Sequence, residues 1–425
     1  MLRKKTWPRW PWRRLAAFGP GLLVMLADTD AGNIIAAAQA GAQTRYALLP
    51  LIVALTAPLF LIQELAARLG LYSGLGFGAS VRRHYGKFWA LLALAGLIAS
   101  ALATLVTEFS GIAGVGELFG LSREITLPAV SFLLLAIVVT GAYRRIEQIA
   151  LILGLSEIAF LFVAWNARPD WSAVLQDMSD HVVFWPFASA PLGFLAAATI
   201  GAVFNPWMIF YQQAATARKK LSPADFAAVR LDTAVGAVLS QALTGAVLVA
   251  AAASLANANG LDSVGAIAQA LSAALGPKIG VVLFGFGVVG ASLAAAIVAS
   301  LALSWGVSEI LQPVAGVVRP GLKNLAENAG LFTSRRALGF YAAAIAGSAT
   351  LVRFSANLVW LNLVAQAINA LLFPITAALL IAVAVKTLPA PTRPRRVSLA
   401  LAILLVGLLA GVAVSGAIAA AGIPT

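Results

Sequence analysis

Two carboxylates stand inside a stretch that is otherwise apolar enough to cross a membrane. Residues 19–45 read GPGLLVMLADTDAGNIIAAAQAGAQTR, with Asp28 and Asp30 near the middle. A carboxylate at the bilayer centre costs about 3 kcal/mol on insertion scales, so it is tolerated where it faces protein, water or a cation. The Ala-Gly-Asn sequence at 31–33 favours local unwinding, because Gly relaxes the backbone and an Asn side chain replaces lost backbone bonds. The stretch therefore predicts a helix broken at 31–33, with a cation site at the midplane.

The rest of the chain has the composition of a polytopic helical membrane protein. Hydrophobic residues make up 61% of the 425 and charged residues only 11%, against about 25% charged in an ordinary soluble protein. Apolar runs long enough to span a bilayer recur along the whole sequence, which predicts one helical bundle without a sizeable soluble domain. The predicted spans are 15–43, 46–71, 88–120, 124–143, 147–166, 188–217, 227–256, 278–311, 336–352, 356–386 and 397–420.

The positive charges divide unevenly between the two ends of these spans. Of the 29 Lys and Arg residues, one end carries only Arg45, Arg123, Arg168, Lys278 and Arg353. Because cytoplasmic loops are enriched in Lys and Arg, the N-terminus is predicted to be cytoplasmic, and an odd number of spans places the C-terminus outside. The net charge of +13 therefore reports topology rather than nucleic-acid binding. The basic tail, 1–14, contains three Trp suited to anchoring at the membrane interface.

A second interruption is predicted five spans after the first. The sixth span reads FLAAATIGAVFNPWMIFYQQAATARKK, with Asn205 and Pro206 near its middle. Proline lacks a donor and clashes with the carbonyl four residues back, so it kinks or breaks a helix and frees carbonyls, that of Ala202 among them. A proline kink alone is common in membrane helices. Paired interruptions at corresponding places in two halves, however, indicate the midplane site of a transporter.

These two stretches carry a family resemblance. The first resembles the first span of the Nramp (natural resistance-associated macrophage protein) divalent-metal transporters, whose Asp-Pro-Gly-Asn motif is matched by Asp-Ala-Gly-Asn at 30–33. The second is similar to the sixth span of that family, whose Met-Pro-His is matched by Asn-Pro-Trp at 205–207. The IQELAARLG segment at 62–70 and the neighbourhood of Thr107 and Glu108 agree as well.

The resemblance implies an all-α membrane protein with a LeuT-type fold and about eleven transmembrane helices, of which helices 1 and 6 are broken. The implied organisation is a cytoplasmic tail at 1–14, inverted five-helix repeats at 15–166 and 188–386, and an eleventh helix at 397–420. The metal ligands that carry over are the side chains of Asp30, Asn33 and Asn205 and the carbonyl of Ala202, with Gln366 as a further ligand on occlusion.

Selectivity is where the sequence departs from the family. The soft thioether of the family becomes Asn205, an oxygen donor, and oxygen ligands suit Mg²⁺, Ca²⁺ and Mn²⁺. Asp28 is an additional acid, which would attract a divalent cation from the outer shell and suits a partly hydrated Mg²⁺. The alternative for Asp28 is a structural hydrogen bond or cation contact inside the bundle. The pattern resembles the magnesium-transporting branch of the family.

Proton handling departs from the family too. Its two sixth-span histidines correspond to Trp207 and Gln212, and its third-span acids to Glu108 and Gly111, so one carboxylate is missing. The two histidines of the sequence, His84 and His181, both fall in predicted loops. The membrane region is therefore predicted to lack a histidine proton relay. We take Glu64, Glu108, Trp207 and Gln212 as candidates for gating or coupling.

Other charged residues leave simpler interpretations open. Glu64 and Arg68 are one helical turn apart and would form a structural pair or an inner gate. Glu117 and Glu157 would either face aqueous gaps or be satisfied by neighbours, and the sequence does not distinguish the two. Asp232 is predicted to lie at the cytoplasmic interface.

The sequence thus predicts a multi-pass transporter of the cytoplasmic membrane that takes up Mg²⁺ or Mn²⁺ by alternating access, as a monomer surrounded by lipid. The cation is the substrate, no cofactor or nucleic acid is expected, and uniport is favoured over proton symport. The rivals are a proton-coupled Mn²⁺/Fe²⁺ symporter and a LeuT-fold amino-acid or organic-solute symporter. Asp28 and Asp30 count against the latter, because its half-helix N-termini would bind an anion. An enzyme is not expected, since no nucleophile elbow, metal-binding His pair or Ser/His/Asp arrangement is evident.

Overall fold

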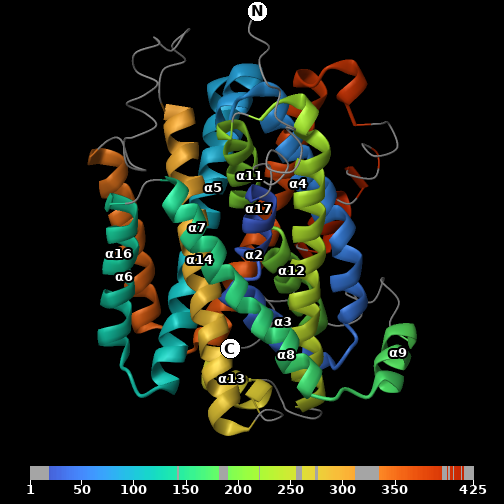
Figure 1. Ribbon diagram of the computed structural model, residues 1–425, viewed down its shortest axis with the longest axis vertical. Helices are drawn as coiled ribbons and strands as arrows, with labels where there is room; N and C mark the ends of the chain where they lie inside the picture. Colours follow the sequence, from blue (N-terminus) through green and yellow to red (C-terminus); the bar gives the residue numbers. More distant parts are fainter. Residues whose placement is uncertain are drawn as a thin grey trace, which may run out of the picture.

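Long helices running roughly along one direction form the protein (Figure 1). The computed structural model describes residues 19–140, 143–180, 190–219, 221–254, 261–272, 276–311, 335–394 and most of 400–415, and no strand occurs among them. The elements are α2 Pro20–Leu26, α3 Ala31–Thr44, α4 Leu49–Ser73, α5 Phe77–Leu118, α6 Arg123–Thr140, α7 Tyr143–Gly154, η1 Leu155–Ile158, α8 Ala159–Asn166, α9 Trp171–Asp180, α10 Ala190–Val203, α11 Pro206–Arg218, η3 Pro223–Asp225, α12 Phe226–Ser254, α13 Val264–Ser272, α14 Pro277–Leu311, α16 Arg335–Phe354, α17 Leu358–Thr387 and η5 Ala390–Thr392.

These helices match the predicted spans. Within the described residues, seven helices are long and apolar enough to cross a membrane, and α2 with α3 forms one more span that is bent by 52°. The α6 and α16 helices occupy the places of the fourth and ninth predicted spans, and described residues between 400 and 415 are helical where the eleventh is expected. The predicted all-helical membrane fold is therefore confirmed.

The beginning of α5 differs from the prediction. The third span was expected to begin at residue 88, but the helix begins at Phe77 and bends at Gly86, whose φ of +85° is open to glycine at little cost. His84 consequently lies in this first helical segment rather than in a loop, where its ring nitrogen Nε2 is 3.2 Å from the Thr387 hydroxyl. The loop prediction for His84 was wrong, and that for His181 lies outside the described residues.

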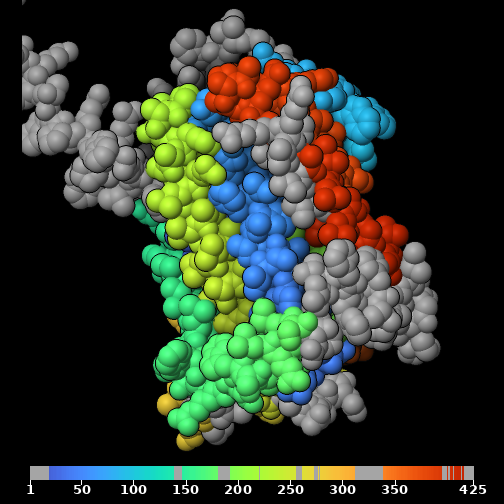
Figure 2. Space-filling view, turned by 90° about the vertical axis from the view of Figure 1, so that its right-hand side faces the viewer, coloured from blue at the N-terminus to red at the C-terminus, as the bar shows by residue number. Residues whose placement is uncertain are grey.

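Two short helices, α9 and α13, lie at the lower end of the bundle in Figure 1. Both fall in segments that we predicted as loops on one side of the membrane. Figure 2 shows α12 and α4 side by side over much of one face, with the segment that includes α9 across its lower end. Which end is cytoplasmic stays a prediction, and the basic tail at 1–14 lies outside the described residues.

Asp232 holds the start of the first span in place. Its carboxylate on α12 accepts hydrogen bonds from the backbone N–H groups of Gly19, Gly21 and Leu22, at 3.1, 2.7 and 3.2 Å. The first N–H groups of a helix have no partner within the helix, and they carry the positive end of its dipole. Asp232 is therefore buried against α2, only 1% exposed, while its place at the cytoplasmic interface stays a prediction.

We expect Asp232→Ala to lower the apparent melting temperature by several degrees, because three donors of α2 lose a charged acceptor worth about 1–3 kcal/mol. Asp232→Asn keeps one oxygen acceptor and should cost less. Thermal unfolding of the purified protein in detergent measures both, with Asp262→Ala, at an exposed position, as the control. Equal melting temperatures for Asp232→Ala and the control would show that this contact does not stabilise α2.

Candidate metal site

The first span breaks at residues 27–30, just before the place that we predicted. The α2 helix ends at Leu26, and Asp30 takes an extended conformation with ψ −179° before α3 begins at Ala31. Its Oδ1 accepts the N–H of Asn33 at 2.7 Å, so the carboxylate caps α3. Asp is among the strongest N-cap residues, which makes residues 31–33 the first turn of a helix rather than an unwound segment. The prediction of a break at 31–33 was wrong by a few residues for this reason.

The sixth span is interrupted at residues 204–205. The α10 helix ends at Val203, Asn205 has the extended angles φ −95° and ψ 127°, and α11 begins at Pro206. Because Pro206 has no N–H, it cannot bond the carbonyl of Ala202. That carbonyl instead accepts the Asn33 amide at 3.2 Å and the Asn205 amide at 3.4 Å.

The two breaks face each other through buried polar groups. The Asn205 Nδ2 group donates to Asp28 Oδ1 at 3.1 Å as well as to the Ala202 carbonyl, so oxygens of both spans converge on one amide. Asn33 joins the same group through its amide on the Ala202 carbonyl, and its Oδ1 accepts the Thr244 hydroxyl at 2.8 Å. All the side chains of this group except that of Thr244 are fully buried, and Thr244 is 1% exposed. The structure thus brings Asp28, Asn33, Ala202 and Asn205 together.

The tenth span closes the group from a third side. Asn369 on α17 donates to Asn205 Oδ1 at 2.5 Å and to Gln366 Oε1 at 3.1 Å. The Gln366 amide lies over Gly32, where a Cβ would overlap it. Gln366 therefore lies beside the first break, while Asn369, which we did not single out, makes the direct contact with the second. The sequence did carry a signal for Asn369, because it is a polar residue one turn after Gln366 in an apolar span.

Two carboxylate oxygens in this region are buried without a hydrogen-bond partner, Asp28 Oδ2 and Asp30 Oδ2. An uncompensated carboxylate in a low-dielectric interior is costly, and a cation removes the cost. Among the described residues, no group of three or more His, Cys, Asp or Glu is arranged to hold a metal ion. A cation here would accordingly depend on amide and carbonyl oxygens beside two carboxylates.

Of the four candidates for gating or coupling, Glu108 contacts the site directly, whereas Trp207 and Gln212 form their hydrogen bonds with other residues. Glu108 interacts with the Asp30 side chain, and its oxygens accept the Ala31 N–H at 3.2 Å and the Thr107 hydroxyl at 3.0 Å. Trp207 donates instead to the Thr104 hydroxyl at 2.9 Å. Gln212 donates to the Thr233 hydroxyl at 3.4 Å, away from the two breaks.

The fourth coupling candidate, Glu64, forms the ion pair that its spacing predicts, with Arg68 Nη2 2.5 Å from Glu64 Oε1. The pair does not involve the two breaks. Arg68 also donates to the Thr392 carbonyl at 2.9 Å and lies over the ring of Phe226. It therefore joins α4 to the segment after α17 and to α12. These contacts fit a structural pair, and a gating role stays a prediction.

The missing third-span acid has a steric explanation. A Cβ built at Gly111 would overlap the Cβ of Ala31 in the first turn of α3. We expect Gly111→Ala to lower the melting temperature even though alanine favours a helix by about 1 kcal/mol over glycine. Gly347→Ala, on a helix face with nothing within 4 Å, is the matched control and should be neutral or stabilising. A Gly111→Ala variant as stable as this control would show that α3 shifts freely.

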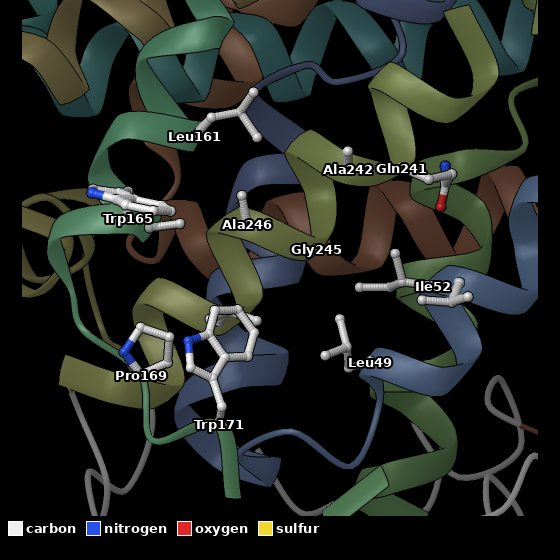
Figure 3. A pocket seen from close by; sticks show the side chains of 13 residues that line it. Leu49, Ile52, Leu161, Trp165, Pro169, Trp171, Gln241, Ala242, Gly245 and Ala246 are labelled. Carbon is white, nitrogen blue, oxygen red and sulfur yellow. The ribbon is translucent and has the colours of Figure 1, made fainter. Parts of the chain in front are cut away.

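A separate apolar pocket of about 330 Å³ lies between α4, α8 and α12 (Figure 3). Gln241 is the single polar side chain among its thirteen lining residues, and none of the residues at the two breaks contributes to it. Its lining has no charged group, so the pocket does not suit a metal ion.

The geometry can be compared with known proteins. A family model described as "Natural resistance-associated macrophage protein-like", Nramp, matches residues 21–419. The chain belongs to the Nramp family. The resemblance inferred from residues 30–33 and 205–207 is therefore confirmed over nearly the whole chain.

Relatives of this Nramp chain are named divalent metal cation transporter MntH. The protein from Brucella suis is 30% identical over 204 residues, which cover 47% of this chain and 44% of that protein. The protein from Ralstonia nicotianae is 31% identical over 300 residues, or 66% of each chain. The chain thus spans about half the length of the first of these curated relatives.

Solved structures confirm the fold. The manganese transporter of Eremococcus coleocola superimposes with a TM-score of 0.71 at 19% identity, covering 98% of this chain and 89% of the other. Mhp1, a nucleobase-cation-symport-1 family transporter, gives 0.57 at 14% identity, covering 95% and 90%. At such low identity the likeness concerns the fold alone. The LeuT-type architecture expected from the sequence is thereby confirmed, whereas the repeat boundaries stay a prediction.

Proposed function

We propose that this Nramp protein carries a hard divalent cation, Mg²⁺ or Mn²⁺, across the cytoplasmic membrane by alternating access. The observation that supports it most directly is the convergence of Asp28 Oδ1 and the Ala202 carbonyl on the Asn205 amide, between two interrupted spans. Helices broken at the midplane of a transporter supply unsatisfied backbone and side-chain oxygens for a cation.

The ligand set consists of oxygens. Asp30 supplies charge, while Asn33, Asn205 and the Ala202 carbonyl supply neutral oxygens, with Gln366 added on occlusion. Asp28 supplies a second charge from beside Asn205. The amide nitrogens of Asn33 and Asn205 donate to the Ala202 carbonyl, while their oxygens accept from Thr244 and Asn369. Ion binding would exchange these hydrogen bonds for contacts with the amide oxygens.

Hard-metal selectivity follows from these donors. Carboxylate, carbonyl and amide oxygens suit Mg²⁺ and Mn²⁺, while a thioether or thiolate would favour softer metals. The MntH relatives are named divalent metal cation transporters and a structural neighbour is named a manganese transporter, which supports Mn²⁺ as a substrate. Asn205 stands where the family has a thioether, and this exchange of sulfur for oxygen supports Mg²⁺ as a substrate.

The proposed transport is inward uniport. Trp207 and Gln212 occupy the places of the family's sixth-span histidines and cannot take up protons at neutral pH. The membrane potential favours cation entry by about 2.3 kcal/mol per charge per 100 mV, and by roughly twice that for an uncompensated divalent ion. A proton gradient is therefore not required for uptake. The protein acts as a multi-pass monomer with its N-terminus in the cytoplasm.

Uptake of Mn²⁺ into proteoliposomes with an inside-negative potential and equal pH on both sides tests the proposal. We expect saturable uptake that millimolar Mg²⁺ inhibits, with no acidification of the lumen. Liposomes without protein are the control. Uptake that required a pH gradient and acidified the lumen would exclude uniport, and the absence of any uptake would exclude the transport function.

A proton-coupled symporter is the second candidate, because Glu108 interacts directly with Asp30. A carboxyl group in that position could exchange a proton with the solvent when a cation binds to Asp30. The same experiment separates the two functions, since only symport moves protons with the metal.

A further inference from the structure

Glu157 is a buried acid to which the proposed transport assigns no role. It lies in η1, a four-residue 3₁₀ segment between α7 and α8 in the middle of the fifth span. A stretch of 3₁₀ helix inside a longer helix often marks a functional site or a sequence under strain. The side chain is fully buried, and neither carboxylate oxygen has a hydrogen-bond partner.

The surroundings of Glu157 contain hydroxyl groups. The Thr29 side chain, within the first break, interacts with Glu157. Its hydroxyl also donates to Ser240 Oγ on α12 at 3.1 Å. Both hydroxyls are fully buried, so a carboxylate from span 5 lies beside a hydroxyl of span 1, which is itself held by a hydroxyl of span 7.

This arrangement is closely packed on its other sides. A Cβ at Gly290 of α14 would overlap the Ser156 hydroxyl, next to Glu157. A Cβ at Gly154 would approach Leu26 at the end of α2 to 3.0 Å and Glu157 Oε1 to 3.6 Å. Helices α14 and α2 therefore press directly on this part of span 5.

No Lys, Arg or His among the described residues forms an ion pair with Glu157. The ion pairs among the described residues join Arg45 to Asp177, Arg68 to Glu64, Arg123 to Glu117, Lys219 to Glu147 and Arg353 to Glu124. Glu117 thus has a partner, although its side chain stays 44% exposed, while Glu157 has no ion-pair partner among the described residues. A protonated Glu157 could donate to the Thr29 hydroxyl but would leave its second oxygen without a partner, whereas a bound cation would be shared by both carboxylate oxygens and that hydroxyl.

We propose that Glu157, together with the hydroxyl of Thr29 that Ser240 holds in place, binds a monovalent cation of the Na⁺ type at a second site. One carboxylate with a neutral hydroxyl oxygen balances a single positive charge and presents only hard donors. The site is distinct from the divalent-metal site, but Thr29 lies between Asp28 and Asp30, so the two are adjacent. Two cations so close in a low dielectric repel each other, and each weakens the binding of the other by the same factor.

Binding of radioactive ²²Na⁺ to the purified protein tests the second site. We expect saturable binding to the wild type, at least about tenfold weaker binding to Glu157→Gln, and intermediate binding to Glu157→Asp, which keeps the charge on a shorter side chain. Glu124→Gln, at an exposed pair with Arg353, is the matched control and should bind as the wild type does. A melting curve identifies any variant that fails to fold, and Thr29→Val with Ser240→Ala then serves as the second test of the same site.

Calorimetric titration with Mn²⁺, with and without Na⁺, completes the test. We expect Na⁺ to weaken Mn²⁺ binding severalfold in the wild type and to have no effect in Glu157→Gln, which itself retains Mn²⁺ binding. Absence of ²²Na⁺ binding to the wild type, or equal binding to Glu157→Gln, would overturn the second site. Na⁺ binding without any Mn²⁺ binding would instead support the second site while contradicting the proposed function.

Discussion

Asp30→Ala is expected to lower the affinity for Mn²⁺ and Mg²⁺ by at least about 100-fold, or about 2.8 kcal/mol, in calorimetric titrations of the purified protein. The variant removes a fully buried carboxylate whose Oδ2 has no hydrogen-bond partner and which would face the ion. A divalent cation in a low-dielectric site depends on such charges, because the single carboxylate that remains, Asp28, and neutral oxygens offset less of its dehydration.

Asp30 also caps α3 through Asn33, so alanine could act through the helix instead of the ion. Asp30→Asn separates the two effects, because Asn is as good an N-cap as Asp but carries no charge. We expect Asp30→Asn to lose affinity nearly as strongly as alanine while keeping the wild-type melting temperature. Full metal binding by Asp30→Asn would show that Asp30 acts only as a cap.

Asn205→Met is expected to change which metal is bound. A thioether in place of the amide oxygen should raise the preference for Cd²⁺ over Mg²⁺ by about tenfold or more, because sulfur ligands favour soft metals. Competition of Mg²⁺ and Cd²⁺ against bound Mn²⁺ measures the ratio. The substitution also removes the hydrogen bonds of Asn205 with Asp28 and Asn369, so weaker Mg²⁺ binding is expected alongside.

Asn205→Leu is the control for this exchange. Leucine has a similar volume and removes the same amide, but it offers no sulfur. We expect Asn205→Leu to weaken all three metals without raising the preference for Cd²⁺. An equal shift in the leucine and methionine variants, or no shift in either, would show that position 205 does not set selectivity through its donor atom.

The helices and their order could be predicted from the sequence because apolar runs of this length have few other ways to fold. The described spans begin and end close to the predicted positions, except that α5 extends back to Phe77 and α9 and α13 form in predicted loops. The break in the first span was predicted a few residues late. Local composition at 31–33 pointed to unwinding, but the capping bond from Asp30 to Asn33 makes those residues helical.

The neighbours of the site could not be predicted in the same way. Asn369, Thr244 and Ser240 lie on helices that are distant in sequence from the two breaks, and a polar residue in an apolar span does not reveal which neighbour it faces. The burial of Asp232 against α2 was missed for the same reason, because its position in the sequence is equally suited to the membrane interface.

The sequence by itself determined that this protein is a helical membrane bundle of the Nramp type, with acids and amides at two interruptions. Hydrophobic length and proline chemistry are local properties, so they can be read along the chain. Only the tertiary structure decided that Asn205 contacts Asp28 as well as the Ala202 carbonyl, and that Glu157 is enclosed beside Thr29 without a partner. Those contacts depend on how helices pack across long sequence separations, where differences of one helical turn determine which side chains meet.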